Sequence, residues 1–476
     1  MCKLSEEFCG ALWSVLQSEN SLKELHLSYN DMQDAGLEKV FAGLKSQLCE
    51  VEIFKLAGRN LSDKLIKILN DALQSTSSMK ELDLSYSDLQ GSRVELLSDG
   101  LKKLEILRVT MCKLSEESCE TVWLVLQSEN SCLKTLDLSN NDLRDKGVKL
   151  LCAGLKSPHC KLETLILAGC NLEEVTCKNL KSVLHLKNTS LKKVDLSNND
   201  LQDSGVEKLC DGLGSAQCKL EILRLSGCMI TEEGCSSLYT ALSSNLSYLK
   251  ELDLSYNHPG ATGVKFLSEK KKDSGCSLKT LCVEHAGKIR IDPSPKKYAC
   301  ELTLDPNTAH PLLSLSKGNT KAKRVVKVQS YPDHPERFNQ WKQVLCRESL
   351  TGRCYWETEW SGKVYISVAY KSIKRKAGSD DSRFGENEKS WSLKCSNNCY
   401  SVLHNKKNTV NRLPSSRSNR VGVYVDSLAG TISFYRVSTD THTLRHLHTF
   451  TTTFTETLCA GFWVGKVSSV RLCQME

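Results

Sequence analysis

Cysteine and histidine are the residues of this chain best suited to metal binding or nucleophilic chemistry, and the sequence holds 23 cysteines and 11 histidines. A zinc site needs several ligands at short, recurring spacings. The closest cysteine pair, Cys395 and Cys399, has no companion pair of that kind. His442, His446 and His448 would share a metal only if a loop brought them together. We therefore predict no metal site and no cofactor.

The motifs of nucleotide hydrolysis, proteolysis and ester hydrolysis are also missing. Gly-Lys pairs begin at Gly287, Gly362 and Gly465, but none has the upstream glycine and following hydroxyl of a phosphate-binding loop. The sequence contains neither HExxH nor GxSxG. We predict that the chain is not an enzyme and that it lacks a nucleotide-driven motor of its own.

Many of the cysteines mark a repeat instead. Cys112, Cys170 and Cys228 lie 58 residues apart, and buried free thiols pack as small hydrophobic side chains. The N-terminus lacks the layout of a signal peptide, so we predict structural thiols in a cytoplasmic protein rather than a secreted disulfide framework. No apolar stretch reaches the roughly 18 residues of a membrane helix, and we expect no membrane partner.

The repeating phrase reads apolar-x-x-apolar-x-apolar and continues in nearly all copies as x-x-N/C-x-L. Ten copies follow one another at spacings of 25 to 29 residues, which is the signature of leucine-rich repeats. Alternating residues such as Leu136 and Leu138 predict a short strand with one buried face. The later stripe of Val148, Leu151 and Leu155 predicts a helix. The copies begin at Leu22, Val51, Met79, Leu104, Leu133, Leu162, Leu191, Leu220, Leu249 and Leu278.

One strand-helix unit cannot bury its own apolar face, so neighbouring units must stack. We predict an α/β leucine-rich-repeat horseshoe over residues 1–284, with a parallel inner sheet and outer helices. Cysteine and asparagine alternate at the turn after each strand, where they can bond buried backbone groups. Arg59 and Ser87 break the alternation, and the copy that begins at Met79 is four residues short. We expect irregular stacking there.

The residue between the two inner apolar residues of each phrase should face the concave side of the horseshoe. Two interpretations are open. Opposite charges on adjacent strands neutralise one another, or the column is a polar docking surface for a protein partner. The candidate partner-binding residues of this column are Asp83, Arg108, Asp137, Asp195, Arg224 and Asp253.

The period ends near residue 285, and the composition changes with it. Residues 285–476 carry 30 Lys+Arg against 16 Asp+Glu, a net charge of +14, whereas residues 1–284 carry 34 against 40, a net charge of −6. Prolines mark a linker over 285–297. Short β-rich runs such as RVGVYVD and TISFYRV follow, and they predict an all-β sandwich over 298–476.

Three segments of this second part carry a family resemblance. ELTLDPNTAHPLLSLS at 301–316 resembles a PRY segment, and HPERFNQWKQVLCRESLTGRCYWETEW at 334–360 and RVGVYVDSLAGTISFYRV at 420–437 resemble the hallmark blocks of a SPRY domain. The long alternating repeats resemble the ribonuclease-inhibitor type found at the C-terminus of NOD-like receptors (NLRs). The pairing of both modules most resembles the fish-type NLRs.

The resemblance implies a non-enzymatic recognition module of a cytosolic innate immune protein that binds protein or microbial ligands. The chain begins in mid-repeat, and we expect a fragment of a larger receptor with an upstream nucleotide-binding domain. In SPRY domains, loops at one end of the sandwich bind the partner, and the matching loops here span 317–333, 371–388 and 395–411. The candidate contact residues are Lys323, Arg324, Lys374, Arg375, Lys376, Asp380, Asp381, Trp391 and Phe462. Trp391 and Phe462 have a second interpretation as core aromatics.

Two other functions remain open. The basic second half could bind nucleic acid, although its aromatic residues lie within strand phrases and not between the basic runs, as a stacking platform would need. The horseshoe could also inhibit a nuclease, which follows from fold analogy alone.

Overall fold

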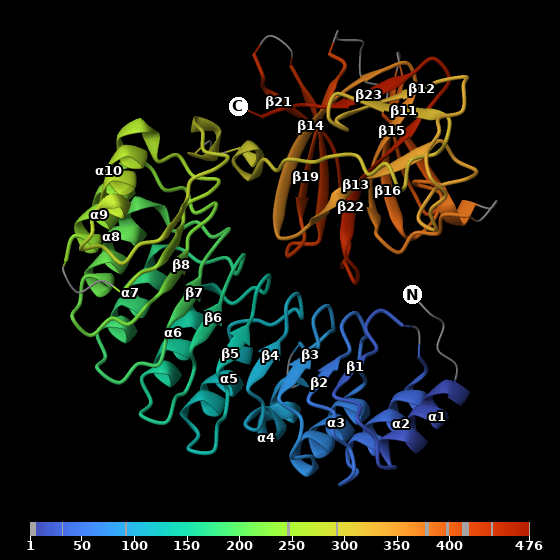
Figure 1. The fold of residues 1–476 in the computed structure, drawn as a ribbon. Coiled ribbons are helices and arrows are strands. Elements are labelled where there is room, and N and C mark those ends of the chain that lie inside the picture. Colours follow the sequence, from blue (N-terminus) through green and yellow to red (C-terminus); the bar gives the residue numbers. More distant parts are fainter. Residues whose placement is uncertain are drawn as a thin grey trace. The chain divides into compact units, whose positions relative to one another are not determined.

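The computed structural model describes residues 6–30, 32–90, 93–244, 248–291, 294–376, 380–396, 399–411, 418–438 and 441–475. The chain divides into two compact units, Met1–Ile291 and Asp292–Glu476, which we call the N-terminal and C-terminal units (Figure 1). The division falls inside the segment 285–297 that the sequence analysis assigned to a linker. Among the described residues, no helix is long and apolar enough to cross a membrane.

The N-terminal unit is built on one parallel sheet of ten strands in chain order, β1 to β10. Each strand has three residues and pairs in register with the next, as Leu136 of β5 does with Leu165 of β6. The strands are β1 (Glu24–His26), β2 (Ile53–Lys55), β3 (Glu81–Asp83), β4 (Ile106–Arg108), β5 (Thr135–Asp137), β6 (Thr164–Ile166), β7 (Lys193–Asp195), β8 (Ile222–Arg224), β9 (Glu251–Asp253) and β10 (Thr280–Cys282).

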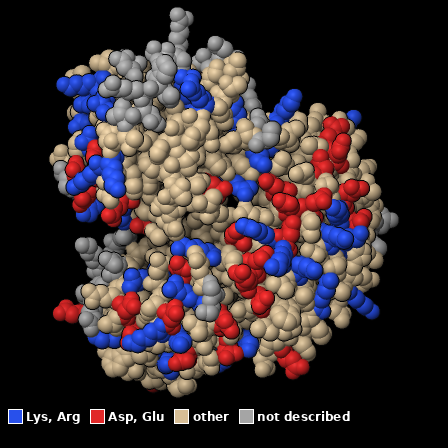
Figure 2. All heavy atoms as spheres, turned by 180° about the vertical axis from the view of Figure 1, so that it is seen from behind, with Lys and Arg blue, Asp and Glu red and all other residues tan. Residues whose placement is uncertain are grey.

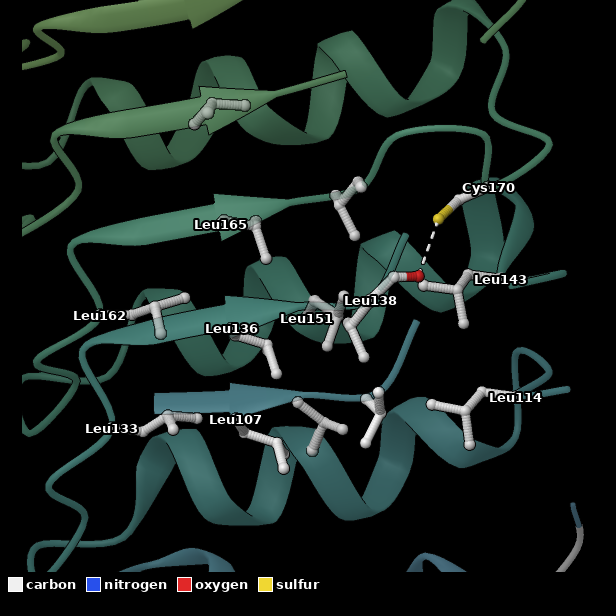
Figure 3. Packing of buried hydrophobic residues seen from close by; sticks show 14 of the residues in the cluster. Leu107, Leu114, Leu133, Leu136, Leu138, Leu143, Leu151, Leu162, Leu165 and Cys170 are labelled. Carbon is white, nitrogen blue, oxygen red and sulfur yellow. Dashed lines mark hydrogen bonds between the residues drawn. The ribbon is translucent and has the colours of Figure 1, made fainter. Parts of the chain in front are cut away.

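Helices cover the outer side of this curved sheet (Figure 1), so the predicted horseshoe is confirmed. The apolar stripe of α6 is buried as the spacing predicted, with Val148, Leu151 and Leu155 facing inward. Figure 3 shows the strand leucines directed into the same layer. The regular helices are α1 (Glu6–Leu16), α2 (Asp34–Leu44), α3 (Asp63–Ser75), α5 (Ser118–Gln127), α6 (Arg144–Leu155), α7 (Glu174–Leu184), α8 (Gln202–Leu213), α9 (Glu232–Leu242) and α10 (Gly260–Lys272).

The alternating asparagines and cysteines form hydrogen bonds to the backbone of neighbouring loops, which confirms the prediction that they bond buried backbone groups. Asn199 is fully buried, and its side-chain amide makes five hydrogen bonds of 2.8–3.3 Å to the backbone. Asn141 and Asn257 repeat this pattern in their own loops. The thiol of Cys170 donates to the carbonyl of Leu138 at 3.2 Å (Figure 3). The partners of Asn199 are the amides of Cys170 and Leu172 and the carbonyls of Leu167, Leu196 and Ser197.

Two further positions alternate from repeat to repeat. The residue after the first apolar position of each phrase alternates between lysine and glutamate from Lys23 to Lys250, and salt bridges of 2.6–3.0 Å join successive repeats. Figure 2 shows acidic and basic side chains intermixed on the visible surface of this unit. In the central repeats, Gly169 has a positive φ of 64° and lies beside Asn140, whose Oδ1 would be 2.6 Å from a Cβ at that glycine. The bridges are Lys80–Glu52, Lys134–Glu105, Lys192–Glu163 and Lys250–Glu221.

The expected irregular stacking lies between β3 and β4. There the outer element shrinks to a 3-10 turn, η2 (Glu95–Leu97), and a four-residue helix, α4 (Ser98–Leu101). Ser87 occupies the asparagine position of this repeat. Its Oγ is buried and makes no hydrogen bond to any described residue. The series of asparagine and cysteine hydrogen bonds between neighbouring loops, which we call the loop ladder, is therefore interrupted at the shortest repeat.

Restoring the asparagine should repair that interruption. We expect Ser87→Asn to raise the free energy of unfolding of the N-terminal unit by about 1 kcal/mol, because an amide can bond backbone groups that a hydroxyl does not reach. Urea unfolding followed by the helical circular dichroism signal measures this, since the α-helices lie in the N-terminal unit. The exposed Ser77→Asn is the matched control and should leave the midpoint unchanged. A Ser87→Asn variant no more stable than the original chain would contradict the expectation.

The C-terminal unit contains two antiparallel sheets with a shared aromatic and aliphatic core, as the predicted sandwich requires. The first has the order β11 (Leu313–Ser316), β12 (Lys321–Arg324), β23 (Ser469–Leu472), β14 (Arg353–Ser361), β19 (Arg420–Asp426), β20 (Thr431–Val437) and β21 (Leu444–Thr451). The second has the order β13 (Gln343–Leu350), β22 (Leu458–Val464), β15 (Val364–Tyr370), β16 (Ser390–Ser396), β17 (Cys399–His404) and β18 (Lys407–Asn411). Short 3-10 turns are η3 (Lys288–Ile291), η4 (Pro295–Tyr298) and η5 (Asp380–Ser382).

Candidate functional site

The ten-stranded sheet of the N-terminal unit presents two rows of side chains on its inner face. In β2 and in β4 to β9, the middle residue of each strand is buried, whereas the first and third residues are half-exposed. The leucines at the middle positions form the core, so the flanking side chains must point to the concave face. All six concave candidates stand at the third position of their strands.

The four aspartates among the candidates are held by their own loops. Oδ1 of Asp137 accepts hydrogen bonds from the backbone amide of Ser139 at 3.0 Å and from its hydroxyl at 2.6 Å. Such a local bond fixes the carboxylate and helps to end the strand. Asp83, Asp195 and Asp253 each accept the amide of the serine two residues later, at 2.9–3.0 Å.

The two arginines are paired with glutamates on the adjacent strands. The guanidinium of Arg224 donates to Oε1 of Glu251 at 2.8 and 3.0 Å, and this bond is the main cause that raises the pKa of Arg224 above its ordinary value. Arg108 donates to Glu81 at 3.3 Å. Opposite charges on adjacent strands thus neutralise one another, which is the first of the two interpretations of the concave column. The two arginine side chains nevertheless remain accessible. The sequence analysis missed both glutamates, although they stand at the first strand position directly beside an arginine strand.

The segment 317–333, which the sequence analysis treated as a loop, is partly a strand, and this is a correction. Lys323 and Arg324 belong to β12, which pairs with β11 on one side and β23 on the other. Alternation along the strand buries Ala322 and leaves the Lys323 side chain exposed. Both basic residues are therefore fixed by the sheet and do not lie in a free loop.

The described residues of the segment 371–388, which exclude 377–379, pack back onto the outer side of the second sheet. Phe384 and Ile373 join Phe338 in a small core of their own. Arg375 is buried, donates to Glu336 and to the carbonyl of Lys371 at 2.8 Å, and lies over the ring of Phe338. Arg375 therefore anchors this loop, and its assignment as a contact residue is corrected, because a buried guanidinium cannot touch a docked partner.

The remaining candidates of this segment lie on the surface. Lys374 and Asp381 form an exposed ion pair at 2.6 Å, and the side chains of Lys376 and Asp380 are exposed. These four residues are the candidates of this segment that a partner can reach. The third predicted loop, 395–411, is largely the hairpin of β17 and β18, which corrects its assignment. Its residues 397 and 398 lie outside the described residues.

The two aromatic candidates belong to the core. Phe462 on β22 is fully buried. Trp391 on β16 stacks on His404 with ring centroids 5.0 Å apart and meets Tyr370 edge-on. The interpretation as core aromatics is therefore correct for both residues, and their assignment as contact residues is corrected.

Four buried thiols of the N-terminal unit are held in the protonated form. Burial raises the pKa of Cys119, Cys152, Cys177 and Cys235 to about 12. The thiolate is the nucleophile and the metal ligand, so these side chains stay protonated and pack as apolar groups. Over the described ranges, no three His, Cys, Asp or Glu side chains are grouped so that they could hold a metal ion.

Comparison with protein-family models divides the chain in the same way. Leucine-rich-repeat models match residues 19–41, 129–152, 187–210, 216–238 and 245–268. The SPRY-associated (PRY) domain model matches residues 302–350, and the SPRY domain model matches residues 353–475.

Relatives of known sequence match the N-terminal part of the chain. The ribonuclease inhibitor of Mus musculus is 38% identical over 284 residues, which are 59% of this chain and 62% of that protein. The ribonuclease inhibitor of Sus scrofa is 37% identical over 320 residues, which are 64% of this chain and 69% of that protein. NACHT, LRR and PYD domains-containing protein 12 of Mus musculus is 37% identical over 284 residues, which are 59% of this chain.

The chain spans 62% of the mouse inhibitor and 27% of the NACHT protein. The shared repeat length, the alternating asparagine and cysteine loops and the identity with the pig inhibitor all point to one kind of repeat. Leucine-rich repeats and SPRY domains together support a protein-interaction module. The chain belongs to the ribonuclease-inhibitor-type leucine-rich-repeat family, and its repeats are followed by a PRY-SPRY domain.

Proposed function

We propose that this chain is the ligand-recognition part of an NLR-like innate immune protein of the cytoplasm, and that it performs no catalysis itself. The concave face of the N-terminal unit would bind a protein or microbial ligand, and the exposed residues of the C-terminal unit would add a second contact surface. The observation that carries this proposal is the concave double row of half-exposed side chains on a rigid parallel sheet.

The energetics of recognition favour such a surface. Arg108 and Arg224 are held in place by glutamates before any partner arrives. Side chains that are already ordered lose less conformational freedom on binding, and arginine is enriched among the residues that dominate interface energies. The aspartates on adjacent strands are likewise fixed by their loops. An upstream nucleotide-binding domain would turn ligand binding into a response.

Site-specific photocrosslinking tests the concave face directly. We expect a photoreactive amino acid in place of Asp195 to yield a discrete covalent adduct with a protein partner in cell extract. The same amino acid in place of Lys149, which is exposed on the outer helix α6, is the matched control and should yield none. Equal labelling from both positions, or none from either, would contradict docking on the concave face.

Inhibition of a ribonuclease is a second candidate, favoured by the identity with two ribonuclease inhibitors. The N-terminal residues carry a net charge of −6, and enzymes that bind RNA present positive charge to it. A titration of pancreatic ribonuclease with the full chain measures this. Loss of RNA cleavage at about equal concentrations of the two proteins would support inhibition, and unchanged cleavage would exclude it for that enzyme.

A further inference from the structure

One end of the C-terminal unit gathers basic side chains from segments far apart in the sequence. The amide of Arg324, at the end of β12, donates to the carbonyl of Ser468 at 3.1 Å. The hydroxyl of Ser468 accepts from the amide of Lys363 at 2.9 Å, and the amide of Val464 donates to the carbonyl of Lys342 at 3.0 Å. We call this surface the basic end, and it consists of Lys323, Arg324, Lys327, Lys342, Lys363 and Lys466 with Val326, Val328 and Val467.

The charge of the basic end is not balanced by acids. Within the described parts of the chain, none of its six basic side chains forms a salt bridge, whereas the lysines that directly precede strands of the N-terminal sheet are paired with glutamates. Burial, with the nearby Arg324 guanidinium as the second cause, lowers the pKa of Lys342. Burial and then Lys342 lower the pKa of the adjacent His310 to about 4. In both shifts burial is the larger cause, and a neighbouring positive charge adds to it.

Three aliphatic side chains project from the same end into water. Val326 is 99% exposed, Val467 is 93% exposed and Val328 is 63% exposed. Val467 also has a positive φ of 51°, which is unfavourable for a β-branched residue. The turn that holds it is fixed by Ser468, whose hydroxyl bonds the neighbouring hairpin at Lys363. Val326 and Val328 lie in the irregular segment after β12 and Val467 in the turn before β23, and side chains this exposed form projections.

We propose that the basic end docks the chain peripherally on an anionic lipid bilayer. The lysines and the arginine would contact headgroup phosphates, and the valines would enter the boundary between headgroups and acyl chains. A polybasic cluster is attracted to anionic lipid, and stable peripheral attachment needs an apolar contribution as well. The basic end supplies both in one place.

A bilayer fits this surface better than an acidic protein does. A protein partner would need preformed cavities that match three projecting valines, whereas a fluid lipid surface accommodates projections without being shaped for them. The sequence analysis expected no membrane partner because no segment is long enough to span one. Peripheral docking needs no such segment, and it goes beyond the proposed recognition of ligands by the concave face.

Co-sedimentation of the full chain with lipid vesicles tests the proposal. We expect the fraction bound to phosphatidylcholine vesicles containing about 30% phosphatidylserine to exceed that bound to pure phosphatidylcholine by at least about tenfold. Lys327→Glu with Lys466→Glu should remove most of that difference. Val326→Ser with Val467→Asn should reduce binding several-fold while leaving its salt dependence unchanged, and asparagine tolerates the backbone of position 467.

A matched control lies at the opposite end of the same unit. Lys406→Glu with Lys407→Glu makes the same change of charge at the exposed turn before β18 and should leave binding within about twofold of the original chain. Equal binding to both kinds of vesicle, or an equal loss in the control, would overturn the proposal. Binding of a soluble polyglutamate peptide or an RNA duplex without binding to vesicles would also overturn it, and would assign the basic end to an acidic protein or to nucleic acid.

Discussion

Replacing Asn199 by alanine is expected to lower the free energy of unfolding of the N-terminal unit by about 3–5 kcal/mol. The substitution removes five buried hydrogen bonds. It leaves the amides of Cys170 and Leu172 and the carbonyl of Leu167 without a partner, whereas the other two carbonyls keep a second donor. Each buried polar group left unpaired costs about 1–3 kcal/mol, and partial relaxation of the loops reduces the sum. Urea unfolding followed by the helical circular dichroism signal measures the loss.

The matched control is Asn188→Ala, since Asn188 is exposed at the turn after α7. It should change the free energy of unfolding by less than about 0.5 kcal/mol. Asn199→Asp distinguishes the acceptor role of the side chain from its donor role. Aspartate keeps an oxygen that can accept from the amides of Cys170 and Leu172, but it loses the NH2 group that donates to the carbonyls. It should also be strongly destabilising, since it buries a charge. If Asn199→Ala unfolds at the same urea concentration as the original chain, the loop ladder does not hold the repeats together.

The second large effect is expected in the C-terminal unit. Glu357 on β14 is 2% exposed, and its Oε2 lies 2.5 Å from Nε of Arg420 on the adjacent strand β19. Its other oxygen accepts the hydroxyl of Tyr355 at 2.8 Å. Arg420→Ala leaves this carboxylate buried without its counter-charge, so we expect a loss of about 3–5 kcal/mol. Tryptophan fluorescence reports the unfolding, since five of the seven tryptophans lie in this unit.

A double variant distinguishes the ion pair from packing. Arg420→Ala with Glu357→Gln removes the buried charge but keeps a group that can bond the Tyr355 hydroxyl. We expect it to be more stable than Arg420→Ala alone. Arg445→Ala, an exposed arginine on β21, is the control for loss of an arginine and should have little effect. A double variant no more stable than the single variant would show that the side-chain packing of Arg420, not its charge, matters.

The architecture of the N-terminal unit could be predicted because each repeat repeats the same local chemistry. Leu136 and Leu138 define a strand, Val148 and Leu151 define a helix, and only stacking buries both. The asparagine ladder was equally predictable, because a polar residue at a fixed turn position must bond the loop backbone. The order of the PRY and SPRY blocks was accessible through family resemblance and not through periodicity.

The contact residues of the C-terminal unit were less predictable. Whether Arg375 is buried depends on Phe338 and Glu336, which lie almost forty residues earlier, and no local pattern encodes that packing. Lys323 was placed in a loop because its strand is short and basic, and only pairing with β11 and β23 makes it a strand. The glutamates opposite Arg108 and Arg224 were readable from the register of the repeats. The exposure of Val467 could not be predicted from the sequence, because an isolated valine in a β-rich segment is expected to be a core residue.

The alternation along the N-terminal sheet has a consequence for how such a protein can change length. Asparagine alternates with cysteine, lysine with glutamate and, in the central repeats, asparagine with glycine. Duplicating or losing a single 29-residue segment would bring like residues together at the new junction: lysine next to lysine and asparagine next to asparagine, or glutamate next to glutamate and cysteine next to cysteine. A 58-residue segment keeps every pairing. Arrays of this kind should therefore gain or lose two repeats at a time. The unit that is duplicated or deleted in evolution is then the pair of repeats and not the single repeat.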